Sequence, residues 1–315
     1  KQKYIIIKNI SNKKDTVFVL LGPTATGKTD ASINLASKMN AEIISADSRQ
    51  VYKHIRLATC APTDLELSKV KHYFVNELEL DSEFNAGMFA KKSKQIIDDV
   101  FKRGKNVLIV GGSGLYIKAL IDGFYEEDID VSEIRNKLNE RLKSEGREVL
   151  YNELKNIDPV SASKMDSGKF RRVIRALEVF YSTGKRISEL QMNNIKPEFD
   201  AVQVGLSADR PLLYERINNR VDSLIQKGLI DEVNNLKKLG FSHLTQNSLN
   251  TVGIKEVFQY LEGETDRDTM IENIKKNTRR YAKRQLTWFN ADKRINWVDI
   301  SIKSLCDKIY NMYFK

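Results

Sequence analysis

The segment TVFVLLGPTATGKTDASINLASKM constrains the fold of this 315-residue chain more than any other part of it. Its first part, Val17–Leu21, is apolar and contains β-branched residues, as expected of a strand buried in a parallel sheet. The pattern G-x-x-x-x-G-K-[ST] is then matched at every fixed position by Gly22, Pro23, Thr24, Ala25, Thr26, Gly27, Lys28 and Thr29. Apolar residues within 33–39 favour a helix packed on the sheet. Strand, loop and helix in this order predict a phosphate-binding loop in an α/β fold, a parallel sheet of the P-loop NTPase type flanked by helices.

The residues of this loop suit a phosphate chain for physical reasons. Glycines let the backbone wrap the phosphates, so that successive N–H groups point inward at a helix N-terminus. Lys28 supplies a point charge for the outer phosphates, and the Thr29 hydroxyl is placed to ligate Mg²⁺. The best candidate for a second nucleotide-site strand, NVLIVGGSGLYIKAL, ends in residues 111–114 without an acid. This argues against an ATPase motor and leaves a kinase or another transferase that acts on a diphosphate.

A polar cluster, ISADSRQVY at residues 44–52, follows a short apolar strand and contains Asp47 at the strand's end. An aspartate in such a place is often only a helix N-cap or a turn residue. Strands of an α/β sheet that end near one another, however, share a crevice in which ligands bind. Asp47 would then face the phosphates held by Lys28, where it could accept a proton from a nucleophile or hydrogen-bond an amine. We therefore interpret Asp47 as a residue of the site.

Composition and charge narrow the class of protein. Hydrophobic residues at 41% and charged residues at 30% are typical of a globular chain of one large or two modest domains. No apolar run approaches the roughly 20 residues that span a bilayer, so we expect no membrane association. Cys60 and Cys306 cannot build a disulfide framework or a cysteine-rich zinc site, and they favour a cytoplasmic setting. The net charge of +10 suggests a polyanionic partner, although a lysine-rich proteome would also produce it.

Several longer motifs occur in a specific order, namely GPTATGKT, EIISADSRQVYK, GGSGLYIKAL, RRVIRALEVF, RINNRVD, NTVGIKE and YAKRQLTWF. With them the chain closely resembles the bacterial type of the tRNA dimethylallyltransferase (tRNA isopentenyltransferase) family, from about residue 17 to about residue 298. The resemblance implies transfer of a dimethylallyl group from dimethylallyl diphosphate to N6 of adenosine 37 in tRNA. It also implies that the loop binds the diphosphate of the prenyl donor rather than ATP, with Mg²⁺ as cofactor. The expected enzyme is a cytoplasmic monomer.

The resemblance assigns roles within the two clusters. Asp47 resembles the catalytic aspartate that binds the N6 amine and takes its proton, and Thr24 and Lys28 belong to the same implied catalytic set. Residues 22–29 are implied to bind the diphosphate, with Thr29 as the metal ligand. Because the diphosphate is the leaving group, the loop would stabilise the charge that develops as the C–O bond breaks.

Two further residues acquire roles only through the resemblance. Arg220 matches a family arginine associated with the diphosphate and with catalysis. Taken alone, it would be interpreted as a surface helix arginine paired with Asp222 or Glu215. Ser113 lines the implied reaction channel and stands where the family usually has threonine.

The middle of the chain is implied to be a helical insertion, residues 123–199, that contacts the anticodon stem-loop. Residues 1–122 and 200–315 would then form the catalytic core. The run RRVIRALEVF combines charges, which more often form a solvated face, with an apolar stripe that is expected to be buried. The implied tRNA contacts are Asp47, Ser48, Arg49, Gln50, Ser113, Arg135, Arg171, Arg172, Val173, Ile174, Arg175, Asn250, Thr251, Val252, Gly253, Ile254 and Lys255.

Near the C-terminus, NIKKNTRRYAKRQLTWF places Lys276, Arg280 and Arg284 on one helical line. Phosphate contacts from such a line would weaken with added salt. Trp288 and Phe289 follow, and two aromatic residues at a helix end are more often core than stacking platforms for bases. We predict that both are core.

Some features depart from the family, and other functions stay open. HIRLATCAPT lacks the usual acidic residue near Arg56 and the usual lysine near Ala61, and His72 is more easily explained as structural than as catalytic.

One rival function is that of a prenyltransferase for free adenine nucleotide, which would not need the arginine-bearing insertion. Another is a P-loop kinase, which would need ATP and ignore tRNA. A non-catalytic RNA-binding protein would leave the complete loop and Asp47 without a purpose.

Overall fold

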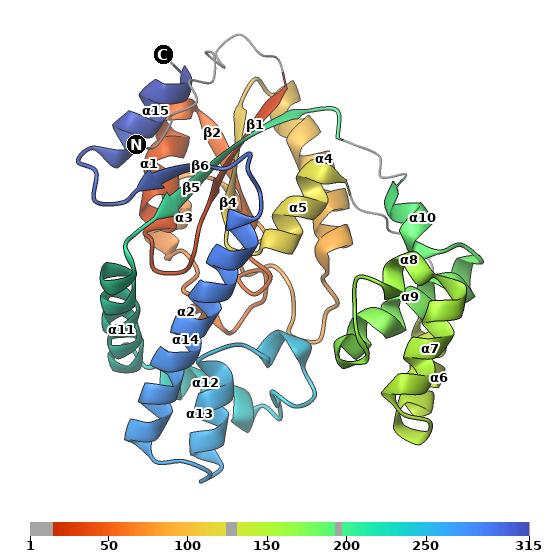
Figure 1. Cartoon of the computed structure of the whole chain (residues 1–315). Coiled ribbons are helices and arrows are strands. Elements are labelled where there is room, and N and C mark those ends of the chain that lie inside the picture. Colours follow the sequence, from red (N-terminus) through yellow and green to blue (C-terminus); the bar gives the residue numbers. More distant parts are fainter. Residues whose placement is uncertain (1–14, 124–130, 193–196, 315) are drawn as a thin grey trace. The chain divides into compact units, whose positions relative to one another are not determined.

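The computed structural model describes residues 15–123, 131–192 and 197–314 (Figure 1). These described residues form two compact units, one combining the residues up to Ile121 with those from Pro197 onward, the other made of the residues between these two parts. Within the described residues the larger unit holds a six-stranded sheet in the order β3-β2-β4-β1-β5-β6, in which all neighbours are parallel. Its strands are β1 (Thr16–Leu21), β2 (Ala41–Ala46), β3 (His72–Tyr73), β4 (Asn106–Gly111), β5 (Asp200–Ser207) and β6 (Asn296–Asp299). The predicted parallel α/β sheet is confirmed.

Helices cover both faces of this sheet because the strand residues are apolar on both sides. Successive residues of β1 alternate, so that Val17 and Val19 belong to one core and Phe18 and Leu20 to the other. The first core packs under α4 (Ala86–Lys102), α5 (Gly114–Asp122), α11 (Arg210–Gln226), α12 (Leu229–Lys238), α13 (Ile254–Leu261) and α14 (Arg267–Asn290). The second packs under α1 (Lys28–Met39) and α15 (Leu305–Phe314), on the opposite side (Figure 1). Short helices α2 (Arg56–Thr59) and α3 (Asp64–Lys69) follow β2.

The strand register brings distant parts of the sequence to one edge of the sheet. Leu21 pairs with Gly111, and Gly111 pairs with Ala46 on its other side, so β1, β4 and β2 end level with one another. Gly111 has no room for a side chain, since a Cβ there would lie 2.1 Å from the carbonyl oxygen of Ala46. Because β4 lies between β1 and β2, the phosphate loop and Asp47 emerge on the two sides of its carboxyl end, where α/β sheets bind ligands.

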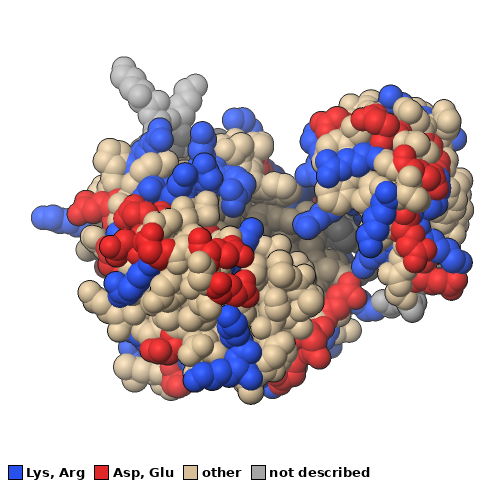
Figure 2. Space-filling model, turned by 90° about the horizontal axis from the view of Figure 1, so that it is seen from below, with Lys and Arg blue, Asp and Glu red and all other residues tan. Residues whose placement is uncertain are grey.

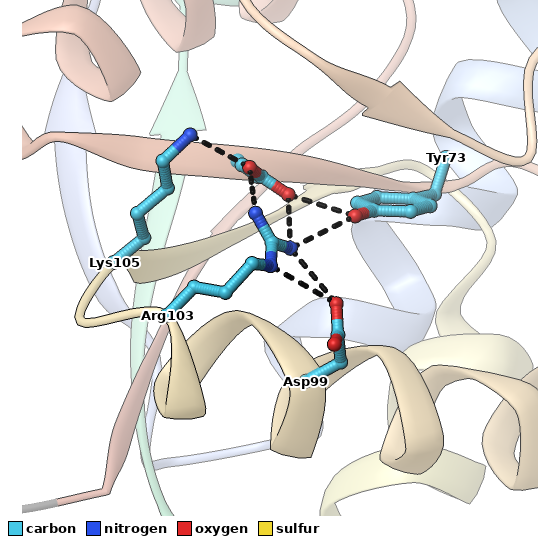
Figure 3. A network of polar contacts seen from close by, with 5 residues as sticks. Tyr73, Asp99, Arg103 and Lys105 are labelled. Atoms are coloured by element: carbon cyan, nitrogen blue, oxygen red, sulfur yellow. Dashed lines mark hydrogen bonds and ion pairs between the residues drawn. The ribbon is translucent and has the colours of Figure 1, made fainter.

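The other end of β2 is held by an ionic network around one buried carboxylate (Figure 3). Glu42 is 2% exposed, and its carboxylate accepts hydrogen bonds from Arg103 at 2.6 and 2.8 Å, from Lys105 at 2.8 Å and from the Tyr73 hydroxyl at 2.7 Å. Asp99 contacts the same guanidinium from α4. The network joins β2, β3, α4 and the segment that enters β4, so it fixes the strands whose opposite ends carry the site.

Helices are the regular secondary structure of the smaller unit within its described residues. It contains α6 (Ser132–Ser144), α7 (Arg147–Ile157), α8 (Pro159–Ala162), α9 (Phe170–Thr183), α10 (Ile187–Met192) and a 3₁₀ turn at Ser167–Lys169. Its own core includes Leu138, Leu150, Leu154, Val173 and Leu177. No helix in the described part of the chain is long and apolar enough to cross a membrane.

Candidate active site

The phosphate loop, residues 22–29, joins β1 to the N-terminus of α1, and hydrogen bonds between its own residues hold it together. The Lys28 ammonium donates to the carbonyl oxygens of Gly22 at 2.9 Å and Pro23 at 2.7 Å. The Thr26 hydroxyl donates to the same Pro23 carbonyl at 2.9 Å. The Lys28 ammonium therefore lies across the loop, where two backbone carbonyls accept its hydrogen bonds. The oxygens of an incoming phosphate chain can replace these carbonyls as acceptors.

Two helices from the second half of the chain hold this loop. Ala25 packs in a small core with residues of α11 and α14, and the Nε of Arg216 in α11 donates to the Ala25 carbonyl at 2.8 Å. Gln285 in α14 accepts from the Thr24 N–H at 2.9 Å and donates to the Gly112 carbonyl at 3.0 Å. Gln285 thus clamps the loop after β1 to the loop after β4.

Neither Arg216 nor Gln285 was assigned a role from the sequence. For Arg216 a signal existed, because it lies four residues before Arg220 in RINNRVD and so shares its helix face. No local pattern distinguishes Gln285 from any other helical glutamine. Gln285 acquires its role only because the sheet brings together the two loops that it contacts.

Asp47 stabilises a turn with its side chain and also lines the cavity. Its Oδ1 accepts the backbone N–H groups of Arg49 at 2.9 Å and Gln50 at 3.3 Å. The next residue, Ser48, donates its N–H to the Ser113 hydroxyl at 3.0 Å, which joins this turn to the loop after β4. Oδ2 has no partner among residues 15–123, 131–192 and 197–314, so one carboxylate oxygen is held and the other is available.

The cavity beside the loop has a volume of about 740 Å³ and is strongly cationic at this end. Lys28, Arg216 and Arg220 all line it, with Asp47 as the nearby carboxylate. Burial and, to a lesser extent, the positive charge of Arg220 lower the pKa of Lys28 to about 7, against the opposing effect of Asp47. A cation that is destabilised by burial and by a neighbouring cation is a binding group for an anion.

The cavity becomes apolar with distance from the loop. Helices α11 and α14 run antiparallel, as the contacts Arg279–Asn218 at 2.6 Å and Lys275–Asp222 at 2.9 Å establish. Going away from the loop, the lining changes on α11 from arginines to Val221 and Leu224, and on α14 from Gln285 and Tyr281 to Thr278 and Ile274. From Arg216 to Leu224 the axial distance is roughly 12 Å at 1.5 Å per residue. This shape suits a molecule with an anionic head and a short apolar tail.

Arg220 is not paired as a surface arginine would be. Its Nε donates to the Cys60 Sγ at 2.9 Å, while Asp222 pairs with Lys275 instead. The backbone around Cys60 is fixed from two sides. Glu232 of α12 accepts the N–H groups at the start of α2, at 2.8 and 2.9 Å, and the Gln50 side-chain amide donates to the carbonyls of residues 59 and 60.

Most of the implied RNA-contact residues of the larger unit border the same cavity. Residues 47–50 and 250–253 line it. The Gln50 side chain is already engaged, however, since it accepts from the Ser45 hydroxyl in addition to its two donations. Ile254 is fully buried, whereas Lys255 is exposed. Among these residues, Arg49, Asn250 and Lys255 offer the more accessible side chains.

The implied contacts of the smaller unit divide into two groups. The side chains of Val173 and Ile174 are buried in its core, so the arginines are the accessible side chains of the implied contact segment 171–175. Arg135 and Arg175 both contact the buried carboxylate of Glu178, at 2.7 and 3.4 Å. Arg171 and Arg172 are exposed and have no partner in the described part of the chain. The free cations of this segment are therefore residues 171 and 172.

Two predictions about single side chains have opposite outcomes. Phe289 is 2% exposed and belongs to the core, as predicted. Trp288 is 42% exposed, so the prediction that it is core was wrong. Consecutive helical residues point about 100° apart, and only one of the two can face the sheet.

His72 lines the cavity. Its Nδ1 lies 2.8 Å from the Val70 carbonyl oxygen, and burial lowers the pKa of its imidazole.

The sequence pattern that defines the IPP transferase family matches residues 50–292. A tRNA dimethylallyltransferase of Salinibacter ruber is 44% identical over 284 residues, which are 90% of this chain and 87% of the relative. The chain belongs to the IPP transferase family. The match extends across both units and includes the helices α11 and α14 that close the cavity.

Solved structures of family members show the same fold. A full-length tRNA isopentenylpyrophosphate transferase of Bacillus halodurans is similar with a TM-score of 0.71 and 35% identity, over 95% of each chain. A eukaryotic dimethylallyltransferase acting on tRNA is similar with a TM-score of 0.80 and 30% identity, over 91% of this chain and 74% of that one. At these identities the likeness extends beyond the fold to the family.

Proposed function

We propose that this chain is a tRNA dimethylallyltransferase that transfers the prenyl group of dimethylallyl diphosphate to N6 of adenosine 37 in tRNA. The observation that carries the proposal is the cavity, which has a cationic phosphate loop at one end, apolar walls at the other and Asp47 beside the loop. Membership of the IPP transferase family supports the reaction class. A structural relative described as acting on tRNA supports the acceptor.

The loop and its helices would bind the donor's diphosphate. Lys28 exchanges its two loop carbonyls for phosphate oxygens, and Arg216 and Arg220 lie along the same wall. In the reaction the C1–O bond of the prenyl diphosphate breaks and its electron pair leaves with the diphosphate. Cations held in place before the reaction stabilise that developing charge more than water does.

Asp47 would bind and deprotonate the acceptor. Its Oδ1 is fixed by the turn, and Oδ2 is available to accept a hydrogen bond from the adenine amino group. The N6–C1 bond forms as the C1–O bond breaks, and the N6 proton passes to Asp47. Because an exocyclic amine is a poor nucleophile, its placement next to C1 contributes as much as the base. The apolar walls at Val221, Leu224 and Ile274 would hold the dimethyl end and exclude water.

Mg²⁺ fits the residues present. The described residues contain no cluster of three or more carboxylates, histidines or cysteines that would hold a metal alone. Mg²⁺ commonly binds through one or two protein oxygens together with substrate phosphates, and Thr29 offers a hydroxyl on the cavity wall. When bound there, the ion would neutralise charge on the diphosphate. One chain supplies every residue in this scheme, so we propose a monomer. The two free cysteines are the reason why we propose a cytoplasmic setting.

The test is prenyl transfer from labelled dimethylallyl diphosphate, with unmodified tRNA and free AMP offered separately. Label in N6-prenyladenosine at position 37 of tRNA, and none on AMP, is the expected result. Label on AMP would make the protein a nucleotide prenyltransferase. Label on neither, with phosphate transfer from ATP to a small molecule, would make it a kinase. Asp47→Asn keeps the turn acceptor, and we expect it to lower kcat by at least roughly 100-fold while tRNA affinity is retained.

A further inference from the structure

Trp288 is an exposed aromatic side chain directly beside the proposed active site. Its indole rests on Gly114, where a Cβ would lie 2.2 Å from Cδ1 and 2.3 Å from Nε1. Gly114 follows Ser113, whose hydroxyl holds the turn that begins at Asp47. One edge of the indole is therefore fixed on the loop after β4, while 42% of the residue remains open to solvent.

The position of Trp288 on α14 continues the wall of the cavity. Tyr281, Arg284 and Gln285 line the cavity, and Trp288 follows them at spacings of seven, four and three residues. Residues at these spacings share one helix face. The indole thus lies on the same helix face as the residues of the cavity wall, one turn beyond Gln285.

The surroundings of the indole indicate what covers it. Lys283 and Arg284, on the turn before it, are exposed, and Leu115, the residue after Gly114, is 49% exposed. On the face of the larger unit that Figure 2 shows, patches of Lys and Arg lie among patches of Asp and Glu. An exposed aromatic ring beside exposed cations is an arrangement with which proteins bind unpaired nucleotides, the cations on phosphates and the ring on a base. A protein partner with an apolar patch would leave these cations unmatched.

We propose that Trp288 is a stacking platform for the nucleobase that flanks the target adenosine in the RNA. This inference rests on the proposed function, because it takes RNA as the substrate. When an adenosine leaves its stack to react, each neighbouring base loses a stacking partner. The indole replaces one of them and thereby holds the loop open next to Asp47. Trp288 is a binding and positioning residue in this scheme, and it takes no part in proton transfer.

Fluorescence can report on this contact because the chain has only two tryptophans. Trp297 lies in β6, where it packs over Gly205. In a Trp297→Phe protein, titration with an anticodon stem-loop RNA should quench the remaining indole through stacking. The matched control is Trp288→Phe, which retains Trp297 and should show little quenching. Equal quenching in both proteins, or none in either, would contradict the platform.

Affinity and kinetics provide the second readout. Trp288→Ala should weaken RNA binding by roughly 5- to 150-fold, the range expected for loss of one base–aromatic stack, and should leave the KM for dimethylallyl diphosphate unchanged. Trp288→Phe should restore part of the loss. RNAs with an abasic residue on the 5′ or the 3′ side of the target, tested one at a time, should identify the partner, because one of them will abolish the penalty of Trp288→Ala. A penalty that is the same on both abasic RNAs would show a merely structural role.

The wild-type protein is tested for prenyl transfer to the same intact RNA in parallel. Transfer without quenching of Trp288 would overturn the platform and leave the proposed function standing. Quenching and an abasic-sensitive penalty without transfer would overturn the proposed function, while the platform would remain as an RNA-binding feature.

Discussion

The Nε of Arg220 donates to the Sγ of Cys60 across 2.9 Å, which joins helix α11 to the residue that follows α2. Cys60 adopts a left-handed conformation there, with φ of 48°. It belongs to the segment HIRLATCAPT, which departs from the usual pattern of the family. The contact therefore orients an arginine of the proposed active site through a residue from the divergent segment.

We predict that Cys60→Ala raises the KM for dimethylallyl diphosphate and lowers kcat/KM, because Arg220 loses the acceptor that orients it. The loss should be only roughly tenfold, because a thiol is a weak hydrogen-bond acceptor even toward a charged donor. Cys60→Ser, which retains an acceptor, should lose less. N-Ethylmaleimide should inactivate the wild type more slowly when inorganic diphosphate is present. Cys306→Ala is the control, because Cys306 packs beside α1 and should not affect the rate of inactivation. Unchanged steady-state constants in Cys60→Ala would show that Arg220 is oriented without the thiol.

The lowered pKa of Lys28 predicts a pH dependence of diphosphate binding. In the free protein the pKa of Lys28 is about 7, and a bound anion favours the charged form and raises it. Below pH 7 the lysine is already charged, so its contribution is constant. Above pH 7 binding must take up a proton, and affinity falls as the pH rises toward the pKa of the complex.

Calorimetry at pH 8 in buffers of different ionisation enthalpy measures this proton uptake. Inorganic diphosphate also titrates, so Lys28→Arg serves as the control because its guanidinium stays charged. The wild type should take up more protons than Lys28→Arg by up to about one per site. Equal uptake in the two proteins would mean that Lys28 is already charged at pH 8.

The sequence predicts the phosphate loop well because all of its determinants are local. Glycine spacing, the lysine and the flanking apolar runs lie within residues 16–39, and the loop occurs where they place it. Asp47 is also predictable, since it ends a strand of a parallel sheet and such strands share one edge. The contact of its turn with the loop after β4, through Ser48 and Ser113, results from the β2-β4-β1 strand order, which no local pattern encodes.

The clamps of the site could not be predicted in the same way. Gln285 contacts Thr24 and Gly112 over sequence separations of 261 and 173 residues, so its role exists only after folding. The error at Trp288 has a different cause. Composition favours burial of aromatic residues, but the face of α14 that packs on the sheet is set by Phe289, which turns its neighbour outward.

The network around Glu42 predicts acid sensitivity that is independent of catalysis. Arg103, with Lys105 and Tyr73, holds the pKa of this buried carboxyl far below its usual value against the opposing effect of burial. A lowered pKa adds stability that is present above the ordinary value of 4.5 and is lost as the pH falls below it. We expect Glu42→Gln to reduce the free energy of unfolding at pH 7 by about 2–4 kcal/mol, because it leaves two cations without their carboxylate.

Denaturant unfolding of Glu42→Gln and wild type at pH 7 and pH 4 measures both parts of this prediction. The difference between the two proteins should shrink at the lower pH. Asp99→Asn is the matched control, since Asp99 contacts the same guanidinium from a side chain that is 66% exposed, and it should cost less than about 1 kcal/mol. A constant difference at both pH values would show that the charge of Glu42 is not what stabilises the fold.

Arginines of the smaller unit should divide into RNA-binding and structural residues. Arg171 is exposed and unpaired among the described residues, so Arg171→Ala should weaken tRNA binding at low salt and reduce the slope of log K against log salt by about 1. Its thermal unfolding should be unchanged. An identical salt slope in the variant would leave Arg171 as an ordinary solvated side chain.

Arg135 is the contrasting case because it neutralises Glu178, whose side chain is 2% exposed. Arg135→Ala should destabilise the protein by about 2–4 kcal/mol, since a buried carboxylate that loses its closest partner is costly. Combining it with Glu178→Gln removes the buried charge, which only the longer contact to Arg175 still compensates, and should recover most of that loss. If tRNA binding by the double variant falls as far as in Arg171→Ala at equal stability, Arg135 contacts RNA as well. If binding recovers together with stability, its part in tRNA binding is to hold α6 against α9 so that residues 171 and 172 are presented on a rigid surface.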